Sequence, residues 1–172
     1  MSKLSIDEGA AWELFATALE PVAPPSIVRM RLVTEVEGWA RYLPFVTELS
    51  RRFALTRERV RQLLAMIDEP GRWTPGIDPI QGSMHFSPGA ALAPLHGGFV
   101  RMLPGTRFPK HRHRESELTF VLEGELSDGD GVVYRPGDAL QMEPGSVHAL
   151  GVASSTPALI ALLNGRIEML GE

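Results

Sequence analysis

The sequence predicts a mainly β fold, a closed barrel or sandwich, preceded by an α-helical N-terminal segment. Two observations lead to this fold class. Apolar residues in the first 70 positions recur at spacings of three and four, which is the period of one helix face. From about residue 70, short apolar runs alternate with Pro-Gly and Asp-Gly turns at roughly 8–12-residue intervals, as in sandwiches and barrels. We therefore assign residues 1–70 to the helical segment and residues 71–172 to the barrel, with the boundary within 69–76.

Three helices are expected within residues 1–70. A proline-rich stretch at 20–25 separates the first from the second, because proline interrupts a helix. The second begins near Ser26 and is ended or kinked near Pro44, and the third starts after Thr56. The residues expected to face inward are Trp12, Phe15, Ala18 and Leu19 in the first, Val28, Leu32, Val36, Trp39 and Leu43 in the second, and Val60, Leu63, Leu64 and Ile67 in the third.

Short strands are expected throughout the rest of the chain. Their length and the glycine-rich turns between them favour a sandwich or a barrel. The runs are 82–86, 98–103, 118–122, 131–134, 139–142 and 158–163, and the barrel core is expected to include Phe108, Phe120, Met142 and Leu162.

Composition narrows the range of functions. The chain has 172 residues, 44% of them apolar, and a net charge of −4, which is enough for a sizeable core and argues weakly against broad nucleic-acid binding. It contains no cysteine, so disulfides, thiolate metal sites and cysteine nucleophiles are excluded. The first residues are unlike a secretory signal, and no apolar run approaches the 20 or so residues of a membrane span. We therefore expect a cytoplasmic protein that does not bind a membrane.

Four residues in the β region are candidate metal ligands. On a helix, His111 and His113 would point about 200° apart, whereas on a strand they face the same side. Four extended residues span roughly 13 Å, so the chain must turn at 114–116 to bring Glu117 back on a neighbouring strand. His148, after a later Pro-Gly turn, fits as the fourth ligand.

The ligand types restrict the ion. Three neutral imidazoles and one carboxylate suit zinc, iron, manganese, nickel or copper better than magnesium or calcium. The alternative is that these are ordinary surface histidines among arginines. Glu115 is a rival carboxylate, but it falls in the expected turn.

The same residues resemble the two conserved motifs of the cupins. The first pattern is Gly105-x5-His111-x-His113-x3-Glu117-x6-Gly124, and the second runs from Gly137 to His148, with Pro144 one place late and Val152 where asparagine is usual. The resemblance covers about residues 80–165. It implies a cupin double-stranded β-helix, or jelly-roll barrel, in which His111, His113, Glu117 and His148 bind one divalent transition metal, with zinc favoured and iron, manganese or nickel as alternatives. It also implies a homodimer.

A helical segment before such a barrel resembles the ChrR-type anti-sigma factors, as do residues 115–118 and 134–138. This resemblance implies that a sigma factor or another protein binds residues 1–70. The sequence departs from that family in lacking the His-x3-Cys-x2-Cys set of its N-terminal zinc site, because there is no cysteine and no histidine before His85.

Residues 46–64 also resemble a helix-turn-helix, with Ala54 in place of the usual turn glycine. Residues 41–65 carry six arginines and two glutamates, so DNA contact through 46–64 is one interpretation. The other is an amphipathic helix pair that packs on the barrel with its arginines in solvent.

Three functional hypotheses follow. The first is a metal-binding, ChrR-like regulatory or sensory protein, which can hold a small-molecule ligand in its barrel. The second is an Fe(II)-dependent dioxygenase acting on a small oxo or hydroxy substrate. A minor third is a helix-turn-helix DNA-binding regulator with a cupin sensor. Tyr134 and Gln141 are candidates to face the cavity, but the sequence identifies no catalytic acid or base.

Overall fold

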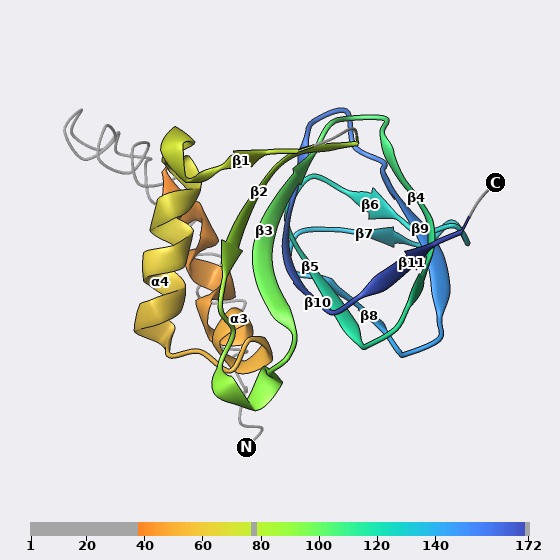
Figure 1. The fold of residues 1–172 in the computed structure, drawn as a ribbon. Coiled ribbons are helices and arrows are strands. Elements are labelled where there is room, and N and C mark those ends of the chain that lie inside the picture. The colour runs from red at the N-terminus through yellow and green to blue at the C-terminus, as the bar shows by residue number, and fades with distance from the viewer. Residues whose placement is uncertain (1–37, 77–78, 171–172) are drawn as a thin grey trace, which may run out of the picture. The chain divides into compact units, whose positions relative to one another are not determined.

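The computed structural model describes residues 38–76 and 79–170, with helices followed by strands in the predicted order (Figure 1). The first expected helix and most of the second lie outside these residues. Within the described part of the chain, no helix is long and apolar enough to cross a membrane.

Short helices occupy the first part of the described chain, and two of them form the expected helix pair. The helix predicted to follow Thr56 does so, since the Thr56 hydroxyl accepts a 3.1 Å hydrogen bond from the backbone N–H of Arg59. Pro44 lies inside a 3₁₀ helix that ends one residue later, at Phe45, and residues 26–37 of the expected second helix lie outside the described residues. The elements are η1 (Trp39–Phe45), α3 (Val46–Arg52), α4 (Arg57–Ala65), η2 (Met66–Asp68) and η3 (Pro70–Arg72).

The turn between α3 and α4 has the geometry that the helix-turn-helix resemblance anticipates. Ala54 has a φ of 52°, in the left-handed region that a turn glycine adopts readily and that costs other residues about 1–2 kcal/mol. Val60 and Leu63 of α4 are buried, whereas Arg57 and Arg59 are exposed. The pair therefore packs by its apolar face with its arginines in solvent, as the packing interpretation expects, and DNA contact stays a prediction.

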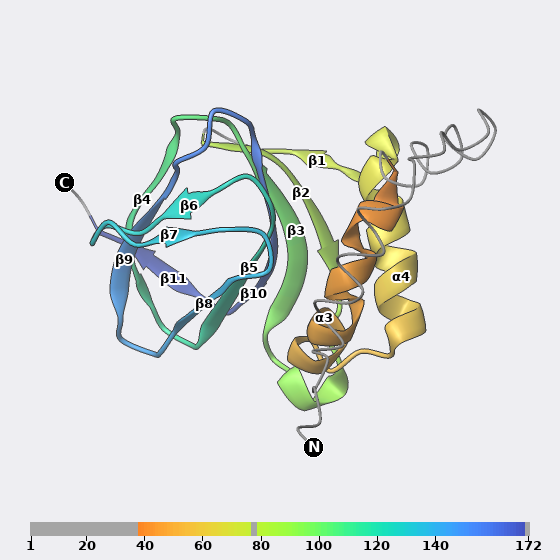
Figure 2. The ribbon, with the colours of Figure 1, turned by 180° about the vertical axis from the view of Figure 1, so that it is seen from behind.

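Two antiparallel sheets follow and curve toward each other into a barrel (Figures 1 and 2). One has the strand order β1-β2-β3-β10-β5-β8 and the other β11-β4-β9-β6-β7. The predicted runs appear as strands, although 131–134 shortens to two residues. Strand β4 was expected only around His111 and His113, and β1, β6, β9 and β11 were not predicted. The strands are β1 (Thr74–Pro75), β2 (Ile80–Phe86), β3 (His96–Met102), β4 (Arg107–His113), β5 (Glu117–Glu123), β6 (Leu126–Ser127), β7 (Val133–Tyr134), β8 (Ala139–Met142), β9 (Val147–Val152), β10 (Ala158–Asn164) and β11 (Ile167–Met169), with a 3₁₀ turn η4 (Ala90–Leu92) between β2 and β3.

The central strands β5 and β10 are buried on both faces. Because side chains alternate along a strand, one face of each points into the barrel and the other points outward. The inward face includes Val121 and Ile160, which belong to the core cluster inside the barrel. The outward face includes Phe120 and Ala161, which pack in a second cluster with the helices. The sequence placed Phe120 in the barrel interior, and this prediction is wrong. Phe120 lies on the outer face of β5, beneath the helices.

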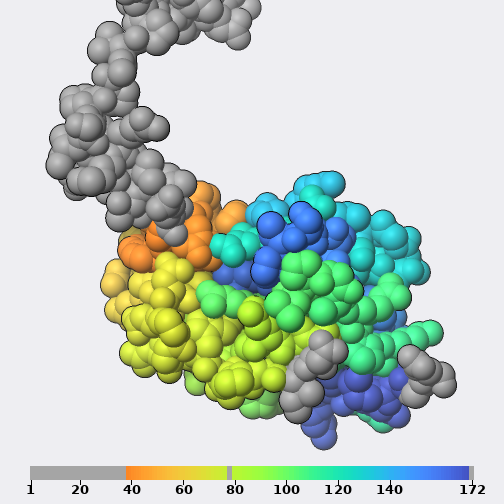
Figure 3. All heavy atoms as spheres, turned by 90° about the horizontal axis from the view of Figure 1, so that it is seen from above, coloured from red at the N-terminus to blue at the C-terminus, as the bar shows by residue number. Residues whose placement is uncertain are grey.

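The helices cover this outer face through apolar and polar contacts. The rings of Phe45 and Phe120 meet edge to face with centroids 5.6 Å apart. The Tyr42 hydroxyl donates a 2.6 Å hydrogen bond to Glu123 at the end of β5, and Arg41 donates to the same carboxylate oxygen at 2.7 Å. In Figure 3 the helical residues, orange to yellow, and the first strands, green, form one continuous surface. The exact domain boundary stays a prediction.

Candidate metal centre

The four candidate ligands come from three strands and both sheets. His111 and His113 lie on β4, His148 lies on the neighbouring β9 with His111 directly opposite it, and Glu117 begins β5 in the other sheet. Residues 114–116 form the turn that the sequence required between Glu117 and the two histidines. The fold therefore brings together the four residues that the sequence singled out.

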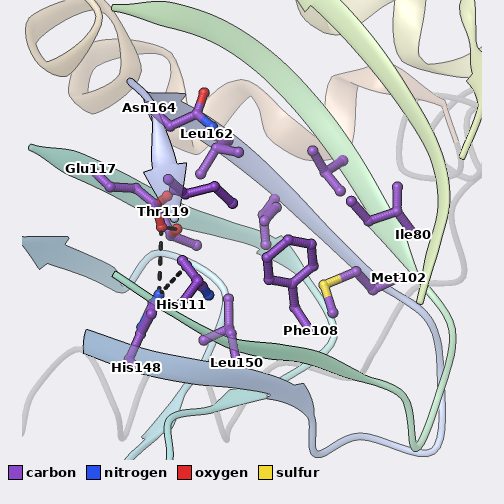
Figure 4. A pocket seen from close by; sticks show the side chains of 13 residues that line it. Ile80, Met102, Phe108, His111, Glu117, Thr119, His148, Leu150, Leu162 and Asn164 are labelled. Carbon is purple, nitrogen blue, oxygen red and sulfur yellow. Dashed lines mark hydrogen bonds and ion pairs between the residues drawn. The ribbon is translucent and has the colours of Figure 1, made fainter. Parts of the chain in front are cut away.

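Their ligand atoms converge on one point inside the barrel. One atom from each residue lies within 4.8 Å of the others. Nε2 of His148 is 3.1 Å from Nε2 of His111 and 3.9 Å from a Glu117 carboxylate oxygen (Figure 4). Nδ1 of His113 is 3.6 Å from the other oxygen of Glu117. All four side chains are buried, with exposed fractions of 1–8%. Buried polar groups need partners, and this arrangement can hold a divalent ion.

Neighbouring groups orient two of these side chains. Nδ1 of His111 donates a 2.8 Å hydrogen bond to the carbonyl oxygen of Pro109, which leaves the lone pair on Nε2, facing His148. The Thr119 hydroxyl donates a 3.2 Å hydrogen bond to Glu117. Among the described residues, no group hydrogen-bonds to the buried Nε2 of His113. Oriented lone pairs and an unpartnered buried nitrogen fit a site built for a cation.

Burial sets the protonation of the cluster. Desolvation lowers the pKa of His113 and His148 to about 4, and the nearby His111 adds to the effect. Desolvation also lowers the pKa of His111 and raises the pKa of the Glu117 carboxyl to about 7. The three imidazoles are therefore neutral near pH 7, which is the form that binds a metal.

These shifts predict how the metal-free protein responds to acid. A histidine with a depressed pKa stabilises the fold above its unfolded pKa of 6.5, and this contribution is lost as the pH falls toward about 4. Glu117 acts in the opposite sense, because its raised pKa favours the fold at low pH and that contribution is lost as the pH rises from 4.5 to about 7. The loss of stability from three histidines exceeds the gain from one carboxyl group as the pH falls. The free energy of unfolding should therefore fall by on the order of 1 kcal/mol per pH unit between pH 6.5 and 4.5.

Urea denaturation in the presence of a chelator, at pH 6.5, 5.5 and 4.5, measures this dependence. The matched control is the double variant His113→Gln/His148→Gln, whose unfolding free energy should change less over the same range. Equal stability of the unaltered protein at all three values would contradict the assignment of buried neutral imidazoles.

A cavity of about 120 Å³ adjoins the cluster inside the barrel. Figure 4 shows His111, Glu117 and His148 at one end and Ile80, Met102 and Phe108 at the other. The described residues that line it are Ile80, Val100, Met102, Phe108, His111, Glu117, Thr119, His148, Leu150, Ile160, Leu162, Asn164 and Ile167.

Several other sequence predictions can be placed. Glu115 is not a ligand, because its carboxylate accepts hydrogen bonds from the backbone and guanidinium of Arg166. Tyr134 and Gln141 do not line the cavity, since the Tyr134 hydroxyl donates to Asp128 and the Gln141 side chain is exposed. The sequence analysis missed Thr119, although it lies two residues from Glu117 on the same strand and so shares its face. It also missed Asn164, for which the sequence carries no motif.

Comparison with known proteins agrees with this geometry. Residues 98–164 match the model of the cupin domain family. Over 65 residues the chain is 32% identical to a putative dimethylsulfoniopropionate lyase, DddL, of Cereibacter sphaeroides. That match covers 37% of this chain and 28% of the relative, so the chain spans less than a third of that relative's length.

Solved structures share the architecture at low sequence identity. The complex of Rhodobacter sphaeroides SigE with the anti-sigma ChrR matches with a TM-score of 0.54 and 15% identity, over 91% of this chain and 75% of that one. An acetylacetone dioxygenase of Acinetobacter johnsonii matches with a TM-score of 0.51 and 10% identity, over 60% and 75%. A cupin-like protein of Thermotoga maritima matches with a TM-score of 0.51 and 18% identity, over 61% and 90%. At these identities the likeness concerns the fold alone.

Proposed function

We propose that this chain, in which residues 98–164 form a cupin domain and the barrel has the cupin fold, is a metal-binding regulatory or sensory protein. It holds one divalent ion through His111, His113, Glu117 and His148. The observation that carries the proposal is the convergence of these four buried side chains from both sheets.

Zinc is the ion we favour. Four protein ligands match the usual coordination number of zinc, which can expand to five when a further donor atom reaches the ion, and imidazole and carboxylate are both zinc ligands. Iron, manganese and nickel accept the same donors. When bound, the ion would act as a Lewis acid toward any donor atom that reaches it.

A regulatory role is supported by the way that β5 links the metal cluster to the helices. The strand begins with Glu117, which faces the cluster, and it carries Phe120 on the opposite face against Phe45. It ends at Glu123, which accepts hydrogen bonds from Arg41 and Tyr42. A shift of β5 on metal binding would therefore reach η1 directly, through Arg41, Tyr42 and Phe45. We infer that residues 1–70 engage a protein partner, and the likeness to a sigma factor–anti-sigma complex makes a sigma factor the first one to test.

Hydrogen exchange tests this coupling. Zinc should slow amide exchange in β4, β5 and β9 and also in residues 39–68, because the helices pack on β5. The Glu117→Gln variant, which keeps the size of the side chain, is the control and should lose both effects. Protection confined to the three ligand-bearing strands would argue against transmission to the helices.

A second candidate function is an Fe(II)-dependent dioxygenase. The apolar cavity beside the ligands favours it, because a bound ion with open positions can meet a small substrate there. We expect the purified, untagged protein to contain one zinc per chain and to show no oxygen uptake with acetylacetone as the probe. Stoichiometric iron together with oxygen uptake would instead establish the dioxygenase.

Two further properties belong to the proposal. Homodimer formation follows from the cupin resemblance, and light scattering at micromolar concentration measures it.

DNA binding through residues 46–64 rests on the exposed arginines of α4, and we rank it below protein binding because Val60, Leu63 and Leu64 of this helix already pack in the core.

A further inference from the structure

We propose that the barrel cavity binds a small, predominantly apolar molecule of about six non-hydrogen atoms, which presents a single donor atom to the metal. This inference deepens the proposed function and rests on the metal assignment. It names the class of ligand that the barrel admits, which neither the fold nor the ligand set specifies.

The apolar and the polar side chains that line the cavity lie in different parts of it. Eight aliphatic, aromatic or thioether side chains surround most of the space, and the imidazole and carboxylate groups gather at one end (Figure 4). Among the described lining residues there is no lysine, arginine or aspartate, and Glu117 is the one charged group. Apart from the candidate ligands, the polar residues in the described part of the lining are Thr119, whose hydroxyl already donates to Glu117, and Asn164.

The size of the cavity limits the ligand. Its volume is about 120 Å³. An engineered protein cavity of about 150 Å³ with a similar apolar lining binds benzene. A six-membered ring or a branched chain of comparable size therefore lies near the upper limit.

Chemistry limits the ligand further. A sugar, a polyol or an amino acid would bury hydroxyl or ammonium groups against Ile80, Met102 and Leu150, which are apolar and cannot pair with them, and each unpaired group costs binding free energy. A pure hydrocarbon would fill the apolar part but offer nothing to the metal. A compact apolar body with one oxygen, nitrogen or sulfur donor satisfies both ends.

Three probes of equal atom count separate these requirements. Pyridine has an apolar ring and one donor nitrogen, benzene has the ring without the donor, and glycerol has six non-hydrogen atoms with three hydroxyls. The protein is loaded with Co²⁺, whose visible absorption reports a new ligand, and the side-chain methyl resonances are followed by NMR. Pyridine should shift the cobalt spectrum and bind at least tenfold more tightly than benzene. Benzene should perturb the methyl groups without changing the cobalt spectrum, and glycerol should do neither.

A matched pair of substitutions locates the binding. Leu162→Phe enlarges a side chain that lines the cavity without altering a ligand, and it should weaken pyridine binding at least tenfold. Leu103→Phe makes the same change at a residue that is 40% exposed and should leave pyridine binding unchanged. Circular dichroism and cobalt content check that both variants fold.

The outcomes separate the two proposals. Failure to bind cobalt would overturn the proposed metal site. Full cobalt loading without a spectral response to pyridine would overturn the cavity inference and leave the metal site intact. Glycerol binding as tight as pyridine binding, in the unaltered protein, would also overturn the inference and does not depend on how either variant folds.

Discussion

Replacing His113 by alanine should reduce the metal content of the purified protein from one ion per chain to a small fraction. His113 is 1% exposed and contributes one of four converging ligands. Loss of a hydrogen-bonding partner behind a ligand already lowers metal affinity by about 10–100-fold, so loss of the ligand itself should cost more than 100-fold. Elemental analysis after dialysis and a competition titration with a chromophoric chelator measure the change.

The control for this experiment is Glu115→Gln. Glu115 is the nearest carboxylate in sequence to Glu117, but it is bound to Arg166 outside the cluster. Its substitution should leave metal content unchanged. If His113→Ala retains one tightly bound ion per chain, or if Glu115→Gln loses it, the ligand assignment is wrong.

Replacing Phe120 by alanine should lower the free energy of unfolding by about 3–5 kcal/mol, the range for large aromatic residues in a core. Phe120 is 1% exposed, and its ring meets that of Phe45 at the contact between β5 and the helices. Removing it leaves a cavity where the helices cover the sheet. Urea denaturation followed by circular dichroism measures the loss.

Leu103→Ala is the matched control, because Leu103 is 40% exposed, and it should change the unfolding free energy by no more than about 0.5 kcal/mol. A small effect of Phe120→Ala, comparable to that of the control, would mean that the helices do not pack on β5 as described.

The ligand set could be predicted from the sequence because strand parity and the cupin pattern agree on it. Parity places His111 and His113 on one face, and the distance argument required the turn before Glu117. The cupin pattern then agreed with the choice of Glu117 over Glu115 and with His148 as the fourth ligand. The structure brings these four residues together.

The outer face of β5 could not be predicted in the same way. Residues 118–122 read Leu-Thr-Phe-Val-Leu, and such a run indicates burial on both faces without saying what covers the second face. Phe120 was therefore assigned to the barrel interior, although it has the opposite parity to Glu117. Because alternate residues of a strand face opposite sides, the inward position of Glu117 already predicts that Phe120 faces outward.

The sequence also could not predict how near each strand residue lies to the cavity. Parity says which face of a sheet a residue occupies, but not how near it lies to a cavity. Tyr134 and Gln141 were candidates to line the cavity, and in the structure one pairs with Asp128 and the other is exposed. Asn164 lines the cavity because β10 runs between β3 and β5, and that pairing depends on long-range topology.

The division of the ligands between the sheets bears on how quickly the ion can exchange. Three come from the sheet that contains β4 and β9, and Glu117 comes from the other. An ion bound to all four would join the sheets from within, so its departure would require either release of the carboxylate or a transient separation of the two layers. Metal off-rates would then follow the opening fluctuations of the barrel and would slow with any substitution that tightens it, even one far from the imidazoles.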